Sequence, residues 1–129
     1  MISRLKTAWM MSRIALGLLA FLAGVDKFLN LLTNWEQYVS PFAARMLPFS
    51  TTTFMHIVGV IEILVGLAIL TKATRLGAYV ATVWLLCIAI NLLMTGKYFD
   101  IAVRDVALAV AAFVLAKLTE IQEDVQAKA

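Results

Sequence analysis

Seven polar side chains lie in or beside long apolar segments of this 129-residue chain, and they are the residues equipped for chemistry. A charged or amide group in hydrocarbon is costly, so it is rarely kept without a partner or a role. Lysine, arginine and asparagine can donate hydrogen bonds to the carbonyl oxygens of a lipid-soluble ligand, and a carboxyl or imidazole group can carry protons. The predicted site, a ligand-binding or intramembrane polar cluster, consists of Asp26, Lys27, His56, Glu62, Asn91, Arg104 and Asp105.

The segments that hold these residues are long enough to cross a membrane. Hydrophobic residues make up 63% of the chain, against about 45–50% in soluble domains. An α-helix needs about 20 apolar residues to cross a hydrocarbon core of about 30 Å. The predicted fold is therefore an all-α, integral-membrane four-helix bundle that forms a single transmembrane domain over residues 1–129. The predicted helices cover residues 7–32, 54–71, 76–95 and 101–119.

Basic residues are distributed unevenly over the ends of these helices. One side of the predicted bundle carries Arg4, Lys6, Lys72, Arg75, Lys117 and Lys128. The other side carries Arg45 and Lys97 outside the helices. Because lysine and arginine are enriched in cytoplasmic connections, this distribution predicts that both termini lie in the cytoplasm.

The long outer connection, residues 33–53, is too aromatic for a solvated linker. It contains Trp35, Tyr38, Phe42 and Phe49. Aromatic side chains of this kind are typical of the membrane interface. The connection is predicted to lie there as a short amphipathic or broken helix, either as a simple anchor or as a lid over a lateral entrance to the bundle.

Lys27 and Glu62 each share a helix face with two glycines. Small residues allow a second helix to approach closely, so both side chains are predicted to point into the bundle. Asp26 is turned about 100° from Lys27, towards another helix or the lipid headgroups. The expected buried ion pairs are Lys27–Glu62 and Arg104–Glu62, which could bind a ligand or hold the helices in register. Arg13 is expected to extend its side chain out to the cytoplasmic interface.

The composition argues against several other kinds of site. The chain has one histidine, His56, and one cysteine, Cys87. A dedicated multi-ligand metal site, a haem held by two histidines and a paired-cysteine redox centre are therefore not expected. The basic residues lie at helix ends instead of forming a patch, so no nucleic-acid partner is predicted.

Several short motifs, in this order and spacing, resemble the DoxX family of small four-helix bacterial membrane proteins. The similarity extends over roughly residues 13–117. Its motifs are Arg13-x3-Gly17, Gly24-Val25-Asp26-Lys27-Phe28, Ile61-Glu62-x3-Gly66-Leu67, Thr74-Arg75-Leu76-Gly77-Ala78 and Arg104-Asp105. The resemblance implies a location in the bacterial inner membrane. Some members of the family are subunits linked to quinone, as in thiosulfate:quinone oxidoreductase, and others belong to oxidative-stress membrane complexes.

Three functions fit these residues and this resemblance. The first is an accessory subunit of a membrane-associated, quinone-linked oxidoreductase complex, with other membrane subunits or further copies of the chain as partners in the lipid bilayer. The second is an autonomous protein that binds a quinone or another lipid-like molecule. The third is a small transporter or proton pathway, which the intramembrane acids motivate. The sequence leaves open whether the chain has an enzymatic activity of its own.

Overall fold

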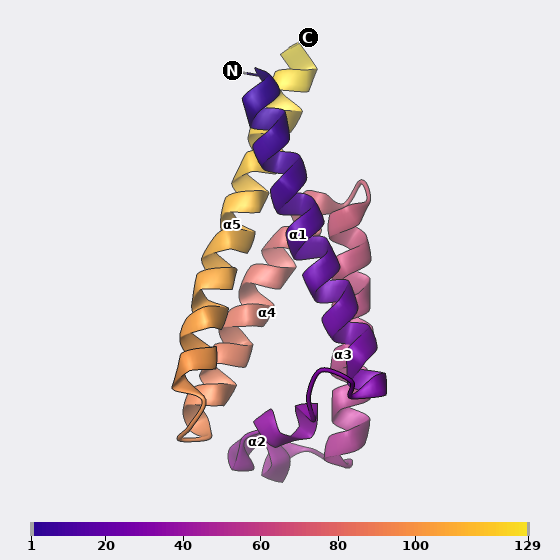
Figure 1. The fold of residues 1–129 in the computed structure, drawn as a ribbon, viewed down its shortest axis with the longest axis vertical. Coiled ribbons are helices and arrows are strands. Elements are labelled where there is room, and N and C mark those ends of the chain that lie inside the picture. The colour runs from indigo at the N-terminus through magenta and orange to yellow at the C-terminus, as the bar shows by residue number, and fades with distance from the viewer. Residues whose placement is uncertain (1, 129) are drawn as a thin grey trace.

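The computed structural model describes residues 2–128, and within them it consists of helices and connections without a strand. Four long helices lie side by side, and two short ones lie in the connection between the first and second of these (Figure 1). Both chain ends lie at one end of the molecule, the termini end, and α2 lies at the opposite end, the α2 end (Figure 1). The elements are α1 (Ile2–Leu29), the 3-10 helix η1 (Trp35–Tyr38), α2 (Pro41–Met46), α3 (Thr51–Leu70), α4 (Thr74–Met94) and α5 (Phe99–Lys128).

The long helices pack as two pairs, α1 with α3 and α4 with α5. At the termini end α1 and α5 lie close together and extend past the turn that joins α3 to α4 (Figure 1). Towards the α2 end α1 crosses over to α3, and the two pairs separate (Figure 1). The connection that contains η1 and α2 lies at this separated end.

Serine side chains begin two of the helices. The Ser40 hydroxyl accepts a hydrogen bond from the Ala43 backbone N–H, and Pro41 occupies the first turn of α2. The Ser50 hydroxyl accepts one from the Thr53 N–H at the start of α3. Both side chains satisfy N–H groups that have no partner within their helix.

Backbone conformation and polar contacts decide where α1 ends. Asn30 adopts a left-handed conformation with φ of 53°, which asparagine tolerates better than most residues. The helix therefore ends at Leu29, whereas the sequence predicted an end at residue 32. At its other end the helix begins at Ile2, earlier than the predicted residue 7.

The last helix is also longer than its sequence predicts, because its second half has partners. α5 extends to Lys128, beyond the expected end at residue 119. The Trp9 indole N–H donates to the Thr119 hydroxyl at 3.0 Å. The Tyr79 hydroxyl donates to the Glu120 carboxylate, also at 3.0 Å. These contacts join the end of α5 to α1 and α4.

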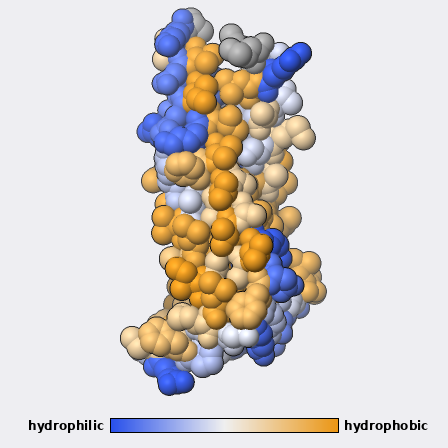
Figure 2. All heavy atoms as spheres, turned by 90° about the vertical axis from the view of Figure 1, so that its left-hand side faces the viewer, coloured by the Kyte–Doolittle hydropathy of each residue, from blue (hydrophilic) through white to orange (hydrophobic). Residues whose placement is uncertain are grey.

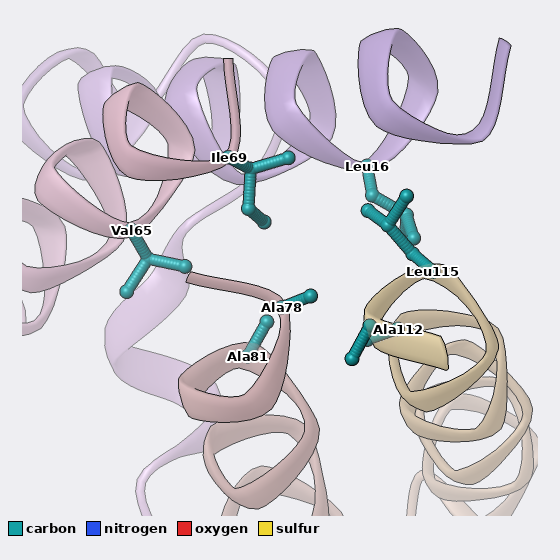
Figure 3. Close-up of a cluster of buried hydrophobic side chains, with 8 residues drawn as sticks. Leu16, Val65, Ile69, Ala78, Ala81, Ala112 and Leu115 are labelled. Carbon is teal, nitrogen blue, oxygen red and sulfur yellow. The ribbon is translucent and has the colours of Figure 1, made fainter. Parts of the chain in front are cut away.

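Small side chains dominate the two clusters at the centre of the packing. One cluster draws residues from α1, α3, α4 and α5, whose side chains point towards one another (Figure 3). It consists of Leu16, Val65, Ile69, Ala78, Ala81, Ala112, Leu115 and Ala116. The second lies nearer the α2 end and consists of Ala89, Leu92 and Ala102, with Tyr38 and Tyr98 packed against it. Alanine at these positions lets the helix backbones approach closely.

Among residues 2–128, three helices are long and apolar enough to cross a membrane: α1, α3 and α4. The sequence prediction of four spans is therefore supported for three of them. α5 is long enough but too charged to count as a candidate span. It carries Asp100, Arg104 and Asp105 near one end and further charges from Lys117 onward. Apolar side chains nevertheless cover the middle of the molecular face shown in Figure 2, and hydrophilic residues gather towards both ends.

The α1–α3 interface is a backbone contact made possible by glycine. A Cβ atom on Gly24 would lie 2.6 Å from the Gly59 carbonyl oxygen and 2.8 Å from the Ile63 backbone nitrogen. A Cβ on Gly59 would in turn lie 2.8 Å from the Gly24 carbonyl oxygen. Because backbone atoms cannot move aside as side chains do, any larger residue would push the helices apart.

Gly24→Ala is expected to lower the free energy of unfolding by about 1–3 kcal/mol, the usual cost of overpacking. Gly17→Ala is the matched control, because the nearest atoms to its new Cβ belong to the flexible Leu70 side chain. Unfolding of both variants in detergent, followed by circular dichroism, measures the difference. Equal losses in the two variants would contradict a backbone contact at Gly24.

Candidate functional site

The centre of the candidate site is a buried ion pair between α1 and α3. Lys27 Nζ lies 2.7 Å from Glu62 Oε1, and the two residues are 6% and 7% exposed. The close glycine crossing brings their helices together, and Lys27 Cβ itself lies against Gly59. Of the two ion pairs expected for Glu62, the structure forms the one with Lys27. Removing one member of such a buried pair leaves an uncompensated charge and typically costs about 3–5 kcal/mol.

Trp35 covers this ion pair from the connection that follows α1. The Lys27 ammonium lies 3.8 Å from the centroid of the Trp35 ring, well within the range of a cation–π interaction. The Trp35 indole N–H donates to Asp26 Oδ2 at 2.8 Å. Two adjacent residues of α1 therefore hold one aromatic side chain, Lys27 through the ring and Asp26 through the N–H.

Asp26 anchors the backbone of the same connection. Its carboxylate accepts hydrogen bonds from the backbone N–H groups of Leu31 and Leu32, at distances of 2.9–3.2 Å. The side chain is 5% exposed. Asp26 thus faces its own connection, and the expectation that it faces another helix or the headgroups was wrong.

Asn91 and Glu36 hold the rest of the connection in place. The Asn91 side-chain amide donates to the Tyr38 carbonyl and accepts from the Ser40 backbone N–H. The Glu36 carboxylate accepts hydrogen bonds from the hydroxyls of Thr51 and Thr52 at the start of α3. Hydrogen bonds from the Thr52 hydroxyl, and to a lesser extent from the Thr51 hydroxyl, lower the pKa of the Glu36 carboxyl group. This carboxyl group is therefore ionised at neutral pH. Asn91 therefore acts on the protein backbone, although the sequence suggested it as a ligand donor.

Arg104 and Asp105 are neighbours in α5 with opposite exposures. Asp105 is 4% exposed, whereas the Arg104 side chain is 62% exposed. Arg104 pairs loosely with Asp105 at 3.4 Å instead of reaching Glu62. A second buried carboxyl group therefore lies in α5, in the other helix pair.

His56 lies apart from these groups. Its side chain is exposed near the start of α3, and its ring stacks on Phe28 with the centroids 4.7 Å apart. The structure therefore pairs Lys27 with Glu62, uses Asp26 and Asn91 to hold the connection, and buries Asp105 in α5. Arg104 and His56 lie apart from the ion pair.

Arg13 has a structural role that the sequence interpretation missed. Its guanidinium donates to the backbone carbonyls of Ile69, Leu70 and Thr71, at distances of 2.6–2.9 Å, and to the Thr74 hydroxyl. The last carbonyls of a helix have no partner within it, and a cation there interacts favourably with the helix dipole. Arg13 therefore caps the end of α3, a structural role that the expected extension towards the interface did not include.

The buried ammonium and carboxyl groups of the candidate site can form hydrogen bonds and exchange protons. The Lys27 ammonium has three N–H donors and no acceptor, and the carboxyl groups of Glu62 and Asp105 can accept or release protons. Among residues 2–128, no three histidine, cysteine, aspartate or glutamate side chains are placed to hold a metal ion together. The group fits recognition of a polar atom on a ligand dissolved in the membrane.

Asp26→Ala is expected to release the connection while the helix pairs stay folded, because three N–H donors lose one acceptor. Hydrogen exchange at the amides of Leu31 and Leu32 should accelerate about tenfold or more. Asp100→Ala, which removes an exposed acid at the start of α5, is the control and should leave these rates unchanged. Unaltered exchange in Asp26→Ala would contradict the anchoring role.

Comparison with known proteins places the chain in a family. The family model described as DoxX matches residues 8–95, which include Lys27, Glu62, Asn91 and the connection between α1 and α3. Arg104 and Asp105 lie outside the matched region. The comparisons with curated proteins and with solved structures found no match. Because the family match covers more than half of the chain, and apolar helices form most of the matched region, this chain is a multi-pass membrane protein of the DoxX family.

Proposed function

We propose that this chain is a small subunit of a quinone-linked complex in the bacterial inner membrane and that it contributes a quinone-binding site. The observation that carries the proposal is the buried Lys27–Glu62 ion pair, at 2.7 Å and covered by the Trp35 ring. A buried ion pair is rarely the most stable choice for its position, since apolar residues of similar volume often serve as well or better. Its presence favours a role beyond packing.

The proposed topology has four spans, with both termini in the cytoplasm. α5 packs against α4 along the core, where Ala112 and Leu115 are fully buried. If α4 crosses the bilayer, its partner α5 must cross with it. The charges of α5 lie towards its two ends, where lysine and arginine can reach the interface. The distribution of basic residues then places the termini end in the cytoplasm and the α2 end outside.

The residues around the ion pair fit a quinone. A quinone needs an apolar slot, hydrogen-bond donors for its carbonyl oxygens and a route for protons. Lys27 supplies a buried donor, the Trp35 ring supplies an aromatic surface beside it, and Glu62 and Asp105 supply two carboxyl groups. When bound, a quinone would supply the capacity to carry electrons and protons through the membrane.

The proposal makes the chain a subunit because electrons must come from elsewhere. The sequence contains one cysteine and one histidine, so it offers no paired thiols and no pair of histidines for a haem. A partner protein with its own redox centre would supply the electrons, and this chain would position the quinone and manage its protons.

A second candidate function is structural. Lys27 and Asp26 together hold Trp35, so the ion pair also ties the long connection to the helices. In that case the Lys27–Glu62 ion pair keeps α1 and α3 in register and binds no ligand.

Gentle extraction of the protein from its own membranes, followed by native mass spectrometry, tests the proposed function. The expected mass contains this chain, at least one different protein chain and a quinone-sized increment. A mass near a multiple of 14.2 kDa with that increment would indicate an autonomous quinone-binding protein. A chain that carries neither partner nor quinone under any gentle condition would contradict the proposal.

A further inference from the structure

Trp84 in α4 holds a buried hydrogen-bond donor that is unused within the described chain. Its indole Nε1 is inaccessible to solvent and has no acceptor among residues 2–128. The other two tryptophans behave differently, since Trp9 donates to Thr119 and Trp35 donates to Asp26. A buried donor without an acceptor loses its hydration and gains nothing in return. This N–H therefore stands out as a group that a ligand could satisfy.

The packing of α3 against α4 places Trp84 at the level of the ion pair. The two helices run antiparallel, Gly77 lies against Ile69, and Ala81 shares a core cluster with Val65. One further turn along each helix leads from Ala81 to Trp84 and from Val65 to Glu62. Trp84 and Glu62 therefore lie at about the same level of their two helices.

α5 supplies a second buried carboxyl group close to this level. α4 and α5 also run antiparallel, with Ala81 near Ala112 in one cluster and Ala89 near Ala102 in the other. Asp105 is 4% exposed and falls between these two levels, about one turn nearer the α2 end than Trp84.

These neighbours define what the indole can bind. An indole N–H is a donor without acceptor capacity, so the bound atom must be an acceptor. An unpaired anion is costly to bury in an apolar surrounding, and a cation has no lone pair to offer. The chemistry therefore selects an uncharged acceptor, and in an apolar surrounding this is a carbonyl oxygen.

We propose that the Trp84 indole N–H donates a hydrogen bond to a carbonyl oxygen of the quinone, an inference that rests on the proposed function. Trp84 then sets both the position and the class of the ligand, because it selects for a neutral carbonyl at the level of Glu62. An internal water molecule could present the same acceptor chemistry, and the experiment must separate the two sources.

The test compares Trp84→Phe with Trp9→Phe, each purified in lipid nanodiscs and titrated with a short-chain ubiquinone. Trp84→Phe removes the N–H but keeps an aromatic ring, so quinone binding should weaken about fivefold to tenfold. Its melting temperature should fall only by the packing that the smaller ring loses, because no hydrogen bond within the chain is lost. Trp9→Phe loses comparable packing and also its hydrogen bond to Thr119, so its melting temperature should fall further while quinone binding stays unchanged.

A nitrogen-15 NMR spectrum of the indole groups gives an independent readout. Trp9→Phe and Trp35→Phe assign two of the three indole resonances, and the third, that of Trp84, should shift downfield when the quinone is added to the wild-type protein. If Trp84→Phe fails to fold, this shift decides the question: its presence supports the inference and its absence overturns it.

The remaining outcomes separate the two proposals. Equal quinone affinity in the wild type and Trp84→Phe would overturn this inference, would point to a water-bound donor and would leave the proposed function standing. Failure of the wild-type protein to bind the quinone would overturn both.

Discussion

The α2 end of this molecule depends on the Lys27–Glu62 ion pair. Its two charges lie where the α1 and α3 backbones meet through Gly24 and Gly59, so the geometry of the pair is set by the helix crossing. The pair in turn places the Lys27 ammonium under Trp35, and Trp35 fixes the start of the long connection through Asp26. A change at the glycine crossing would therefore be transmitted to the ion pair, then to Trp35 and then to the connection.

The two ends of the molecule are stabilised by different means. Towards the termini end, apolar side chains from all four long helices meet in one cluster, and Arg13 caps the end of α3. At the α2 end the helix pairs separate, and polar contacts of Asp26, Glu36 and Asn91 hold the connection. Since the α2 end has less apolar packing, its arrangement depends more on these polar contacts.

Helical periodicity was sufficient to predict some of this arrangement. Lys27 and Glu62 share faces with glycines, so their burial at a close helix contact followed from spacing along each helix. The helix ends and the partners of Asp26, Asn91 and Arg13 could not be predicted in this way. Most of these partners are backbone groups of a connection or helix end, and their positions depend on how the chain folds back. Trp84 was also missed, because one tryptophan in an apolar run looks like any packing residue until the partner of its N–H is known.

The central claim is that the ion pair binds a ligand in addition to holding helices together. The most direct measurement is quinone affinity and melting temperature in Lys27→Met, Glu62→Leu and the double variant. A buried pair replaced on both sides by apolar residues usually keeps its stability, whereas loss of one partner does not. The account predicts that each single variant is destabilised and that the double variant recovers its melting temperature but does not bind the quinone. Full quinone binding by a stable double variant would contradict the account and leave the ion pair with a structural role.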